Sequence, residues 1–200
     1  FVFFLEHKVM RKDMKRLKAA RKAADWMVHF SPSHEGGKKA SAGVGVMWRA
    51  ADVHIHPERI KDPELQEAHL KGMVGKYTVD VGWETAMTFY NIYGESGGTS
   101  ANIAVTEALI LACQRDMALS HQGPHAILGD FNATPCKLGP VKDLIAVDQW
   151  TDIGQRADWW GGTANEWTCH SRSKAKRSRI DGVVVDAEML ATIHSFEVEK

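Results

Sequence analysis

Short apolar runs alternate with amphipathic stretches along the whole chain, and this alternation restricts the fold more than any other feature. Apolar or β-branched runs predict strands at residues 1–5, 43–48, 53–56, 77–81, 86–93, 125–128 and 183–185. Helical spacing of apolar residues predicts helices at 9–27, 100–117 and 140–146, and 58–72 holds either a short helix or a loop. Strands that alternate with helices are typical of α/β proteins. We therefore predict one α/β domain over residues 1–200, without an internal repeat or a linker.

The composition excludes several classes of protein. A content of 44% apolar and 25% charged residues rules out a disordered chain. No apolar stretch approaches the length of about 18 residues that a membrane span needs, so we expect no membrane partner. The 25 basic and 25 acidic residues cancel, and net charge identifies no partner. The cysteines, Cys113, Cys136 and Cys169, are odd in number and widely spaced, which favours an intracellular, reducing compartment over disulfides or structural zinc.

The first residues of the chain resemble the beginning of a secretory signal only briefly. The apolar run 1–5 has no basic residue before it, and Glu6 interrupts it too early for a signal peptide. The chain also starts with Phe1 instead of methionine. We expect a piece of a longer protein that begins inside a buried strand.

Two basic clusters favour a polyanionic partner although the net charge is zero. Residues 8–22 contain eight basic residues and one acid, and helical spacing places Arg11, Lys15, Lys18 and Lys22 along one outer face. A solvated helix face is the simplest explanation of that cluster. The second cluster is a loop-like segment without acids, and it contains Arg172, Lys174, Lys176, Arg177 and Arg179. A loop this basic is more indicative of phosphate contacts.

Polar side chains stand at the ends of several predicted strands, where α/β proteins usually place their sites. Glu6 follows the first strand, Tyr93 ends another, Asp130 and Asn132 follow the apolar run 125–128, and Asp181 precedes the last strand. Each has a simple structural explanation when it is taken alone. Asp130 and Asn132, for example, are compatible with an Asx turn, and Asp181 with an ion pair to Arg179.

Four short motifs contain these residues, and their combination and order are more informative than any single residue. Leu-Glu-His-Lys at 5–8, Asn-Ile-Tyr at 91–93, Gly-Asp-Phe-Asn at 129–132 and Ser-Arg-Ile-Asp at 178–181 resemble the endonuclease/exonuclease/phosphatase superfamily. The closest resemblance is to the apurinic-type endonuclease domains of non-LTR retrotransposons. A fixed four-residue string occurs by chance in such a chain roughly once in a thousand. The resemblance implies a sandwich of two mixed β-sheets flanked by helices, with the site at one edge.

The resemblance also implies a metal-dependent hydrolase of phosphodiester bonds in nucleic acid. Glu6 would be the carboxylate ligand of Mg²⁺, with Mn²⁺ as an alternative, because Mg²⁺ needs only one or two protein carboxylates. Asp130 would orient or deprotonate the attacking water, and Asn132 would donate to a phosphate oxygen. Tyr93 matches a tyrosine near the scissile phosphate. In-line attack needs a group that takes a proton and positive charge near the leaving oxygen, and this set supplies both.

The remaining motif positions include one departure from the family. Thr168 falls where related enzymes keep a phosphate-contacting threonine, and Arg179, at the end of the basic loop, is expected to contact phosphate. Asp181 matches the aspartate that orients the catalytic histidine. That histidine normally lies downstream, but His194 is the only histidine there and lacks the preceding aspartate. The resemblance thus implies a domain that is incomplete at both ends and lacks this histidine.

Three functions remain open from the sequence. The first is a nuclear, retrotransposon-type endonuclease that acts on DNA or another nucleic acid. The second is an inactive or truncated relative that binds nucleic acid without cutting it, and the third is a phosphatase of a small substrate within the same superfamily. We expect packing or surface roles for the other candidates, which are His54, His56, Trp159, Trp160, Trp167 and Cys136.

Overall fold

A computed structural model describes residues 1–5, 9, 11–22, 25–31, 42–80, 82, 86–120, 123–147, 149–170 and 177–198. Within these residues the larger sheet has six strands, in the order β4 (His54–Pro57), β5 (Val74–Asp80), β6 (Met87–Tyr93), β7 (His125–Asp130), β11 (Asp181–Asp186) and β8 (Trp150–Asp152). Strands β6 and β7 pair in parallel and the other neighbours are antiparallel, so this sheet is mixed.

The smaller sheet packs against the larger one. Its described strands are β1 (Val2–Phe4), β3 (Gly45–Arg49) and β2 (Trp26–Phe30), and both of its pairings are antiparallel. A separate short hairpin joins β9 (Cys169–His170) to β10 (Arg177–Ser178). The predicted sandwich of two sheets is confirmed, although only the larger sheet is mixed among the described strands.

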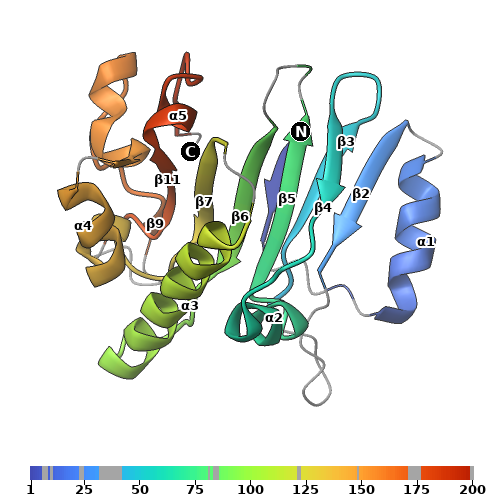
Figure 1. Cartoon of the computed structure of the whole chain (residues 1–200), viewed down its shortest axis with the longest axis horizontal. Helices are drawn as coiled ribbons and strands as arrows, with labels where there is room; N and C mark the ends of the chain where they lie inside the picture. Colours follow the sequence, from blue (N-terminus) through green and yellow to red (C-terminus); the bar gives the residue numbers. More distant parts are fainter. Residues whose placement is uncertain are drawn as a thin grey trace.

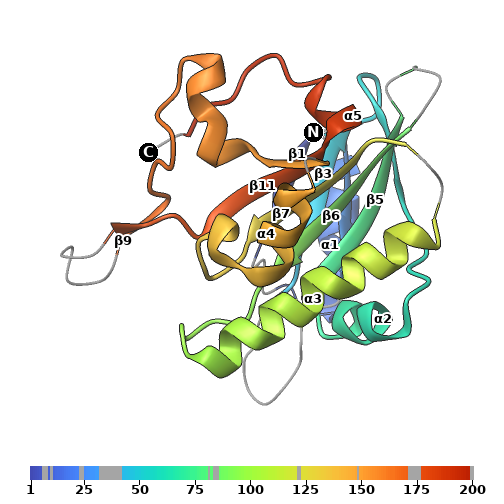
Figure 2. The same ribbon diagram turned by 60° about the vertical axis from the view of Figure 1, so that its left-hand side comes forward.

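Helices cover the outer faces of both sheets (Figures 1 and 2). Helix α1 (Arg11–Lys22) lies beside the small sheet, and α3 (Ser100–Ala118) crosses the large sheet together with α2 (Pro63–Leu70) and α4 (Gly139–Ala146). Short helical segments complete the chain at η1 (Pro135–Lys137), η2 (Ile153–Trp160) and α5 (Ala187–Leu190). None of the described helices combines the length and the apolar composition needed to cross a bilayer.

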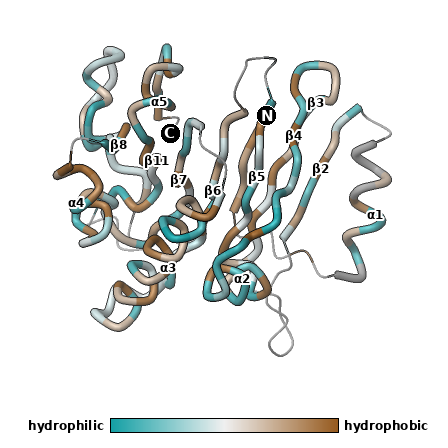
Figure 3. The backbone as a smooth tube through the Cα atoms, viewed as in Figure 1, coloured by the Kyte–Doolittle hydropathy of each residue, from teal (hydrophilic) through white to brown (hydrophobic). Residues whose placement is uncertain are grey.

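The large sheet has one hydrophobic core on each face, because successive strand residues point to opposite sides. On β6, Tyr90 and Ile92 pack against the helices, in a core that also contains Leu109 and Phe131. Phe89 packs on the opposite face, in the core between the sheets. Hydrophobic stretches accordingly recur along the strands in Figure 3. This alternation decides which β6 side chains reach the space between the sheets.

The predicted helix over 9–27 is wrong at its end. Helix α1 ends at Lys22, and Trp26 already belongs to β2, which pairs with β3 over its whole length. Asp25, with a φ of 59°, adopts the left-handed conformation between the two elements. Residues 26–30 are rich in aromatic and β-branched side chains, which favours a strand. The short helix that was one of two alternatives for 58–72 forms as α2.

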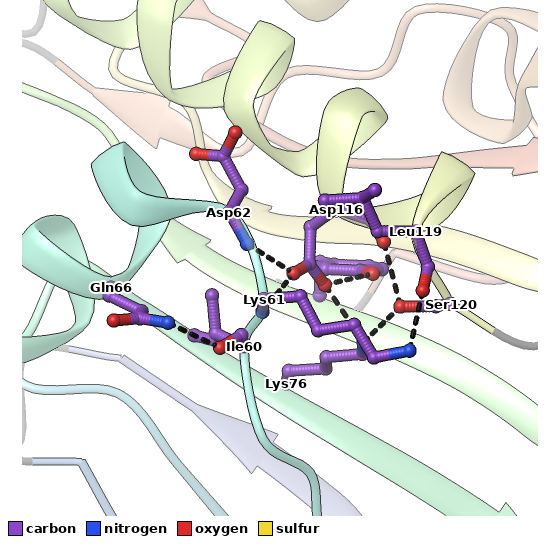
Figure 4. Close-up of polar contacts among 9 residues, drawn as sticks. Ile60, Lys61, Asp62, Gln66, Lys76, Asp116, Leu119 and Ser120 are labelled. Carbon is purple, nitrogen blue, oxygen red and sulfur yellow. Dashed lines mark hydrogen bonds and ion pairs between the residues drawn. The ribbon is translucent and has the colours of Figure 1, made fainter.

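A buried carboxylate, Asp116 of α3, connects that helix to the large sheet (Figure 4). It accepts hydrogen bonds from Lys76 Nζ of β5 at 2.8 Å and from the Tyr90 hydroxyl of β6 at 2.8 Å. It also accepts from the backbone N–H groups of Lys61 and Asp62, the latter at 2.9 Å. Burial alone would raise the pKa of Asp116, but these donors outweigh it and lower the pKa.

We expect Asp116→Ala to destabilise the protein by about 3–5 kcal/mol, because it leaves the buried ammonium of Lys76 without its counter-charge. Urea denaturation measures the loss. Glu67→Gln is the matched control, since Glu67 forms an exposed ion pair with Lys71 on α2 and its removal should change stability little. Equal stability of the two variants would contradict the central role of Asp116.

The lowered pKa of Asp116 also predicts how the stability of the isosteric variant Asp116→Asn, relative to the wild type, depends on pH. A carboxyl whose pKa is lowered on folding stabilises the native state at pH values above its ordinary pKa of 3.8. This stabilisation is lost as the pH falls through the pKa of the folded state. The stability difference between the wild type and Asp116→Asn should therefore be constant from about pH 5 to 8 and narrow below about pH 4. Urea denaturation of both proteins across this pH range measures it, and a difference that stays constant down to about pH 2 would contradict the shift.

Candidate active site

Three predicted site residues lie side by side at one end of three neighbouring strands. Tyr93 ends β6 and Asp130 ends β7, and their parallel register makes them partners. Asp181 begins β11 and is the antiparallel partner of Asp130. Neighbouring strands lie about 5 Å apart, so the pairing brings together residues from distant parts of the sequence. Strands β6, β7 and β11 are adjacent in both ribbon views (Figures 1 and 2).

The side chains of Tyr93, Asp130 and Asp181 share the face of the large sheet that is turned toward the small sheet. Residues two or four positions apart on a strand point to the same side. The residues at those distances that pack in the core between the sheets are Phe89, Ala126, Leu128, Val183 and Val185. All three candidate side chains are half-buried at the margin of this core. They are therefore placed where a ligand can reach them from outside.

The local structure explains the residue types at the first and third positions of the Gly-Asp-Phe-Asn motif. Gly129, with a φ of 138°, passes so close to β6 that an added Cβ would lie 2.0 Å from the Ile92 carbonyl oxygen. Phe131 is fully buried in the core under the helices. The close approach to β6 and the buried Phe131 ring hold Asp130 between them at the end of β7.

Asn132 is held beside Asp130 by two hydrogen bonds. Its backbone N–H donates to Asp130 Oδ1 at 2.8 Å, which is the predicted Asx turn, and Nδ2 donates to the Gly94 carbonyl at 2.8 Å. The residue adopts a left-handed φ of 49°, which asparagine tolerates well. Because an amide carries two N–H groups, Asn132 retains one for another acceptor. Its predicted contact with phosphate stays a prediction.

Thr168 supports Asp181 from the neighbouring segment. The Thr168 Oγ1 accepts hydrogen bonds from the backbone N–H groups of Ile180 at 3.2 Å and Asp181 at 3.1 Å. The hydroxyl thus fixes the backbone where β11 begins. A threonine in this place lies close to the candidate site, and its phosphate contact stays a prediction.

Arg179 forms an internal ion pair. The guanidinium is buried and donates from Nη1 to Asp152 Oδ1 at 2.8 Å and from Nη2 to Asp152 Oδ2 at 2.5 Å. Burial alone would lower the pKa of Arg179, but these bonds to Asp152 raise it. Asp152, and not Asp181, is therefore the observed partner of Arg179. The expected phosphate contact of this side chain stays a prediction and would require it to leave a bidentate pair.

Several predicted residues lie outside the described part of the chain or apart from the site. Glu6 and the basic positions Arg172, Lys174 and Lys176 fall outside the described residues. His194 is exposed, and in the part of the chain that the structure describes no hydrogen bond or ion pair joins it to Asp181.

A comparison with known proteins identifies the family. The family model described as "Endonuclease/Exonuclease/phosphatase family" matches residues 11–198. The chain belongs to this family. No curated protein sequence matches the chain.

Solved structures share the fold of this endonuclease/exonuclease/phosphatase domain. The Xenopus laevis APE2 catalytic domain has a TM-score of 0.65 and 13% identity, and the match covers 94% of this chain and 74% of that one. The D. rerio TDP2 complexed with single-strand DNA product has a TM-score of 0.62 and 17% identity, with 96% and 72% covered. At such identities the likeness establishes the fold alone.

The donor chemistry of the site fits the divalent metal on which family members generally depend. Asp130 and Asp181 are direct partners on antiparallel strands, and like charges in such positions repel unless a cation lies between them. The described residues contain no group of three or more His, Cys, Asp or Glu side chains arranged for a metal. Mg²⁺ keeps several waters and needs only one or two protein carboxylates, and Asp130 and Asp181 supply two.

The expected packing and surface roles fit most of the remaining candidates. His54 and His56 are exposed, Trp160 donates from Nε1 to the Ile193 carbonyl at 3.1 Å, and Arg177 stacks on Trp167 at 4.8 Å. Trp159 is 55% exposed, with Arg156 over its ring. Sequence reasoning assigned no role to two buried polar residues near the site, Asp152 and Asn91, although Asn91 belongs to the Asn-Ile-Tyr motif. An asparagine inside the apolar run 86–93 was a signal for the second.

We expect Gly129→Ala to destabilise the domain by more than about 3 kcal/mol, because the new Cβ collides with the Ile92 backbone and the left-handed φ is also strained. Thermal or urea unfolding measures the loss. Gly82→Ala is the control, since Gly82 has a φ of 80° but open space around it, and only the conformational cost of about 1–2 kcal/mol applies. Similar losses in both variants would show that the close approach is unimportant.

Proposed function

We propose that this domain hydrolyses phosphodiester bonds in nucleic acid with Mg²⁺, or Mn²⁺, as the endonuclease of a retrotransposon-type element that acts in the nucleus. The observation that carries the proposal is the alignment of Tyr93, Asp130 and Asp181 on one face at the ends of three adjacent strands. Family membership restricts the chemistry to phosphoester substrates, and the sequence motifs that resemble retrotransposon endonucleases support the finer assignment.

In the proposed reaction, Asp130 orients the attacking water and accepts its proton, since its carboxylate is fixed by the turn to Asn132. The free N–H of Asn132 and the hydroxyl of Tyr93 donate to phosphate oxygens and stabilise the charge of the transition state. Asp181 provides a second carboxylate, which by the family resemblance would orient a histidine. Glu6 would hold the cation, which would supply positive charge at the leaving oxygen.

Nucleic acid is favoured over a small phosphate by the surface beside the site. Arg177 is exposed and lies on the hairpin strand β10, where it is the partner of His170 in β9. The basic positions of residues 172–176 belong to the same connection in sequence. Positive side chains next to a phosphodiester site position the backbone of a nucleic acid. The D. rerio TDP2 structure, which is complexed with single-strand DNA product, agrees with such a substrate.

A second candidate function is binding of nucleic acid without cleavage. It is favoured by the exposed position of His194, which forms no hydrogen bond or ion pair with Asp181 within the described residues. A domain without an imidazole next to Asp181 would lack one group of the family mechanism but keep its binding surface.

We expect Mg²⁺-dependent nicking of supercoiled plasmid by the wild type, loss of nicking in EDTA, and a decrease of at least about a hundredfold in Asp130→Asn. The control is Asp80→Asn, since Asp80 is exposed at the end of β5 and its carboxylate accepts a hydrogen bond from the backbone N–H of Gly82. If wild type and Asp130→Asn nick equally, the assignment of Asp130 is wrong. A folded wild type that binds DNA without nicking it supports the second candidate.

The salt dependence of binding separates nucleic acid from a small phosphate. For duplex DNA, each neutralised phosphate adds about 0.9 to the slope of log K against log salt. We expect the triple substitution of Arg172, Lys174 and Lys176 by alanine to reduce this slope by about 0.9 for each phosphate that the variant no longer neutralises. Lys71→Ala, an exposed change at the C-cap of α2, serves as control and should leave the slope unchanged. A wild-type slope near zero would instead favour a small phosphorylated substrate.

A further inference from the structure

A pocket of about 460 Å³ lies on the other face of the large sheet from the candidate active site. It is lined by His125, which begins β7, and by Asp186, which ends β11. Ile127 and Val184, two positions away on the same strands, pack in the core under the helices, so His125 and Asp186 also face the helices. The six-residue length of β7 places His125 roughly 17 Å from Asp130. The pocket is therefore separate from the candidate active site.

Strand register and the covering helices together form this pocket. Asp186 is the register partner of Trp150 on β8, so His125, Asp186 and Trp150 form a row across three strands. Helices α3 and α4 lie over this face of the sheet (Figure 2). The helical residues that line the pocket are Gln114 and Met117 of α3, Leu144 of α4, and Ala187 and Glu188 of α5. Segments that are distant in the sequence thus meet around one space.

The His125 ring is oriented by Asp186. One carboxylate oxygen, Oδ2, accepts from the backbone N–H of His125 at 2.7 Å and lies 3.1 Å from His125 Nδ1. The other, Oδ1, accepts from the backbone N–H of Met189 at 2.7 Å. Because a carboxylate only accepts hydrogen bonds, the contact with Nδ1 places the imidazole hydrogen on that nitrogen. In the neutral ring, Nε2 is then an acceptor.

Two side-chain nitrogens in the walls of the pocket have no partner. His125 Nε2 and Gln114 Nε2 are both buried, and neither forms a hydrogen bond within the described residues. The first is an acceptor, and the second is an amide nitrogen that donates. Buried polar atoms without partners are costly, so two of them beside one pocket call for an explanation. A ligand that carries both a donor and an acceptor would satisfy them together.

The other lining residues restrict the chemistry of such a ligand. Trp150 is half-buried, and with Met117 and Leu144 it forms an apolar wall that suits a flat ring. The described lining residues include no lysine or arginine, but they include the carboxylates of Asp186 and Glu188. This charge disfavours phosphate. The volume lies within the range of about 300–1,000 Å³ that is usual for small-molecule sites.

We propose that this pocket binds a nucleobase with an amino group, as the free base or the nucleoside without phosphate. The amino group donates to His125 Nε2, a ring nitrogen accepts from Gln114 Nε2, and the base stacks on Trp150. Because both protein nitrogens are closed to solvent, binding requires the two side chains to rotate until these atoms face the ligand. The site is independent of the proposed nuclease activity.

Adenosine is the probe for the test. Calorimetry should show saturable binding tighter than about 1 mM. In ¹⁵N NMR of histidine-labelled protein, adenosine should shift the Nε2 signal of His125, which is identified by its loss in His125→Asn. The analogue N6,N6-dimethyladenosine has no amino hydrogen and should bind about tenfold more weakly. AMP and oligo(dA) should also bind this pocket more weakly, because their phosphates approach the carboxylates of Asp186 and Glu188.

The substitution Gln114→Met tests the second contact. Methionine has the length and helix propensity of glutamine but no N–H group. We expect adenosine affinity to fall about 5- to 10-fold while stability stays constant or rises, because an unpaired buried donor is removed. Gln66→Met is the matched control, since Gln66 of α2 donates to the Ile60 carbonyl at 2.8 Å and does not line the pocket. It should lose stability but keep the affinity within about twofold.

Each contrary outcome overturns a stated part of the proposal. A folded wild type that does not bind adenosine overturns the site. Binding without a shift of the His125 signal, or with equal affinity in Gln114→Met or for the dimethyl analogue, overturns the proposed recognition. If AMP or oligo(dA) binds as tightly as adenosine and gives the same shift, the exclusion of phosphate is wrong and the base belongs to a nucleotide or a strand. None of these measurements depends on nicking or on a metal, so failure of the proposed function is detected separately.

Discussion

The carboxylate of Asp116 accepts hydrogen bonds from β5, from β6 and from the segment before α2, and the remaining structure depends on this arrangement. Helix α3 connects β6 to β7, and the two strands are parallel only because the helix returns the chain across the sheet. A buried ion pair is costly to desolvate, but once formed it is also costly to break. It therefore holds α3 in one register on the sheet, and with it the relative position of β6 and β7.

The candidate site follows from that register. A shift of one residue between β6 and β7 would separate Tyr93 from Asp130 and turn one of them toward the helices. Gly129 contributes at the same point, since only a glycine allows β7 to approach Ile92 so closely. On the other side, the ion pair of Arg179 with Asp152 connects the segment before β11 to β8 and stabilises the position of Asp181. The geometry of the candidate site thus depends on buried polar contacts outside it.

Local sequence patterns predicted most of the strands and the long helix α3, because their apolar residues have clear periods. They failed between 22 and 30, where the helical spacing of α1 runs into the apolar strand β2 and the turn at Asp25 has no strong signal. The two-residue strands of the β9–β10 hairpin are too short to have a period. The motif residues Tyr93, Asp130 and Asp181 were found from their order in the sequence, although their types alone also fitted turns and surface positions.

The sequence by itself determined the class of fold, the family and the residues at the strand ends, because periodicity and short motifs are local properties of the chain. Only the tertiary structure decided which of those residues meet, since strand order and register depend on contacts between distant segments. It also decided that Arg179 pairs with Asp152 and that Asn91 joins the two sheets. A polar residue in an apolar strand looks the same in the sequence whether it binds a ligand, joins two sheets by hydrogen bonds or has neither role. Only its neighbours in space distinguish these cases.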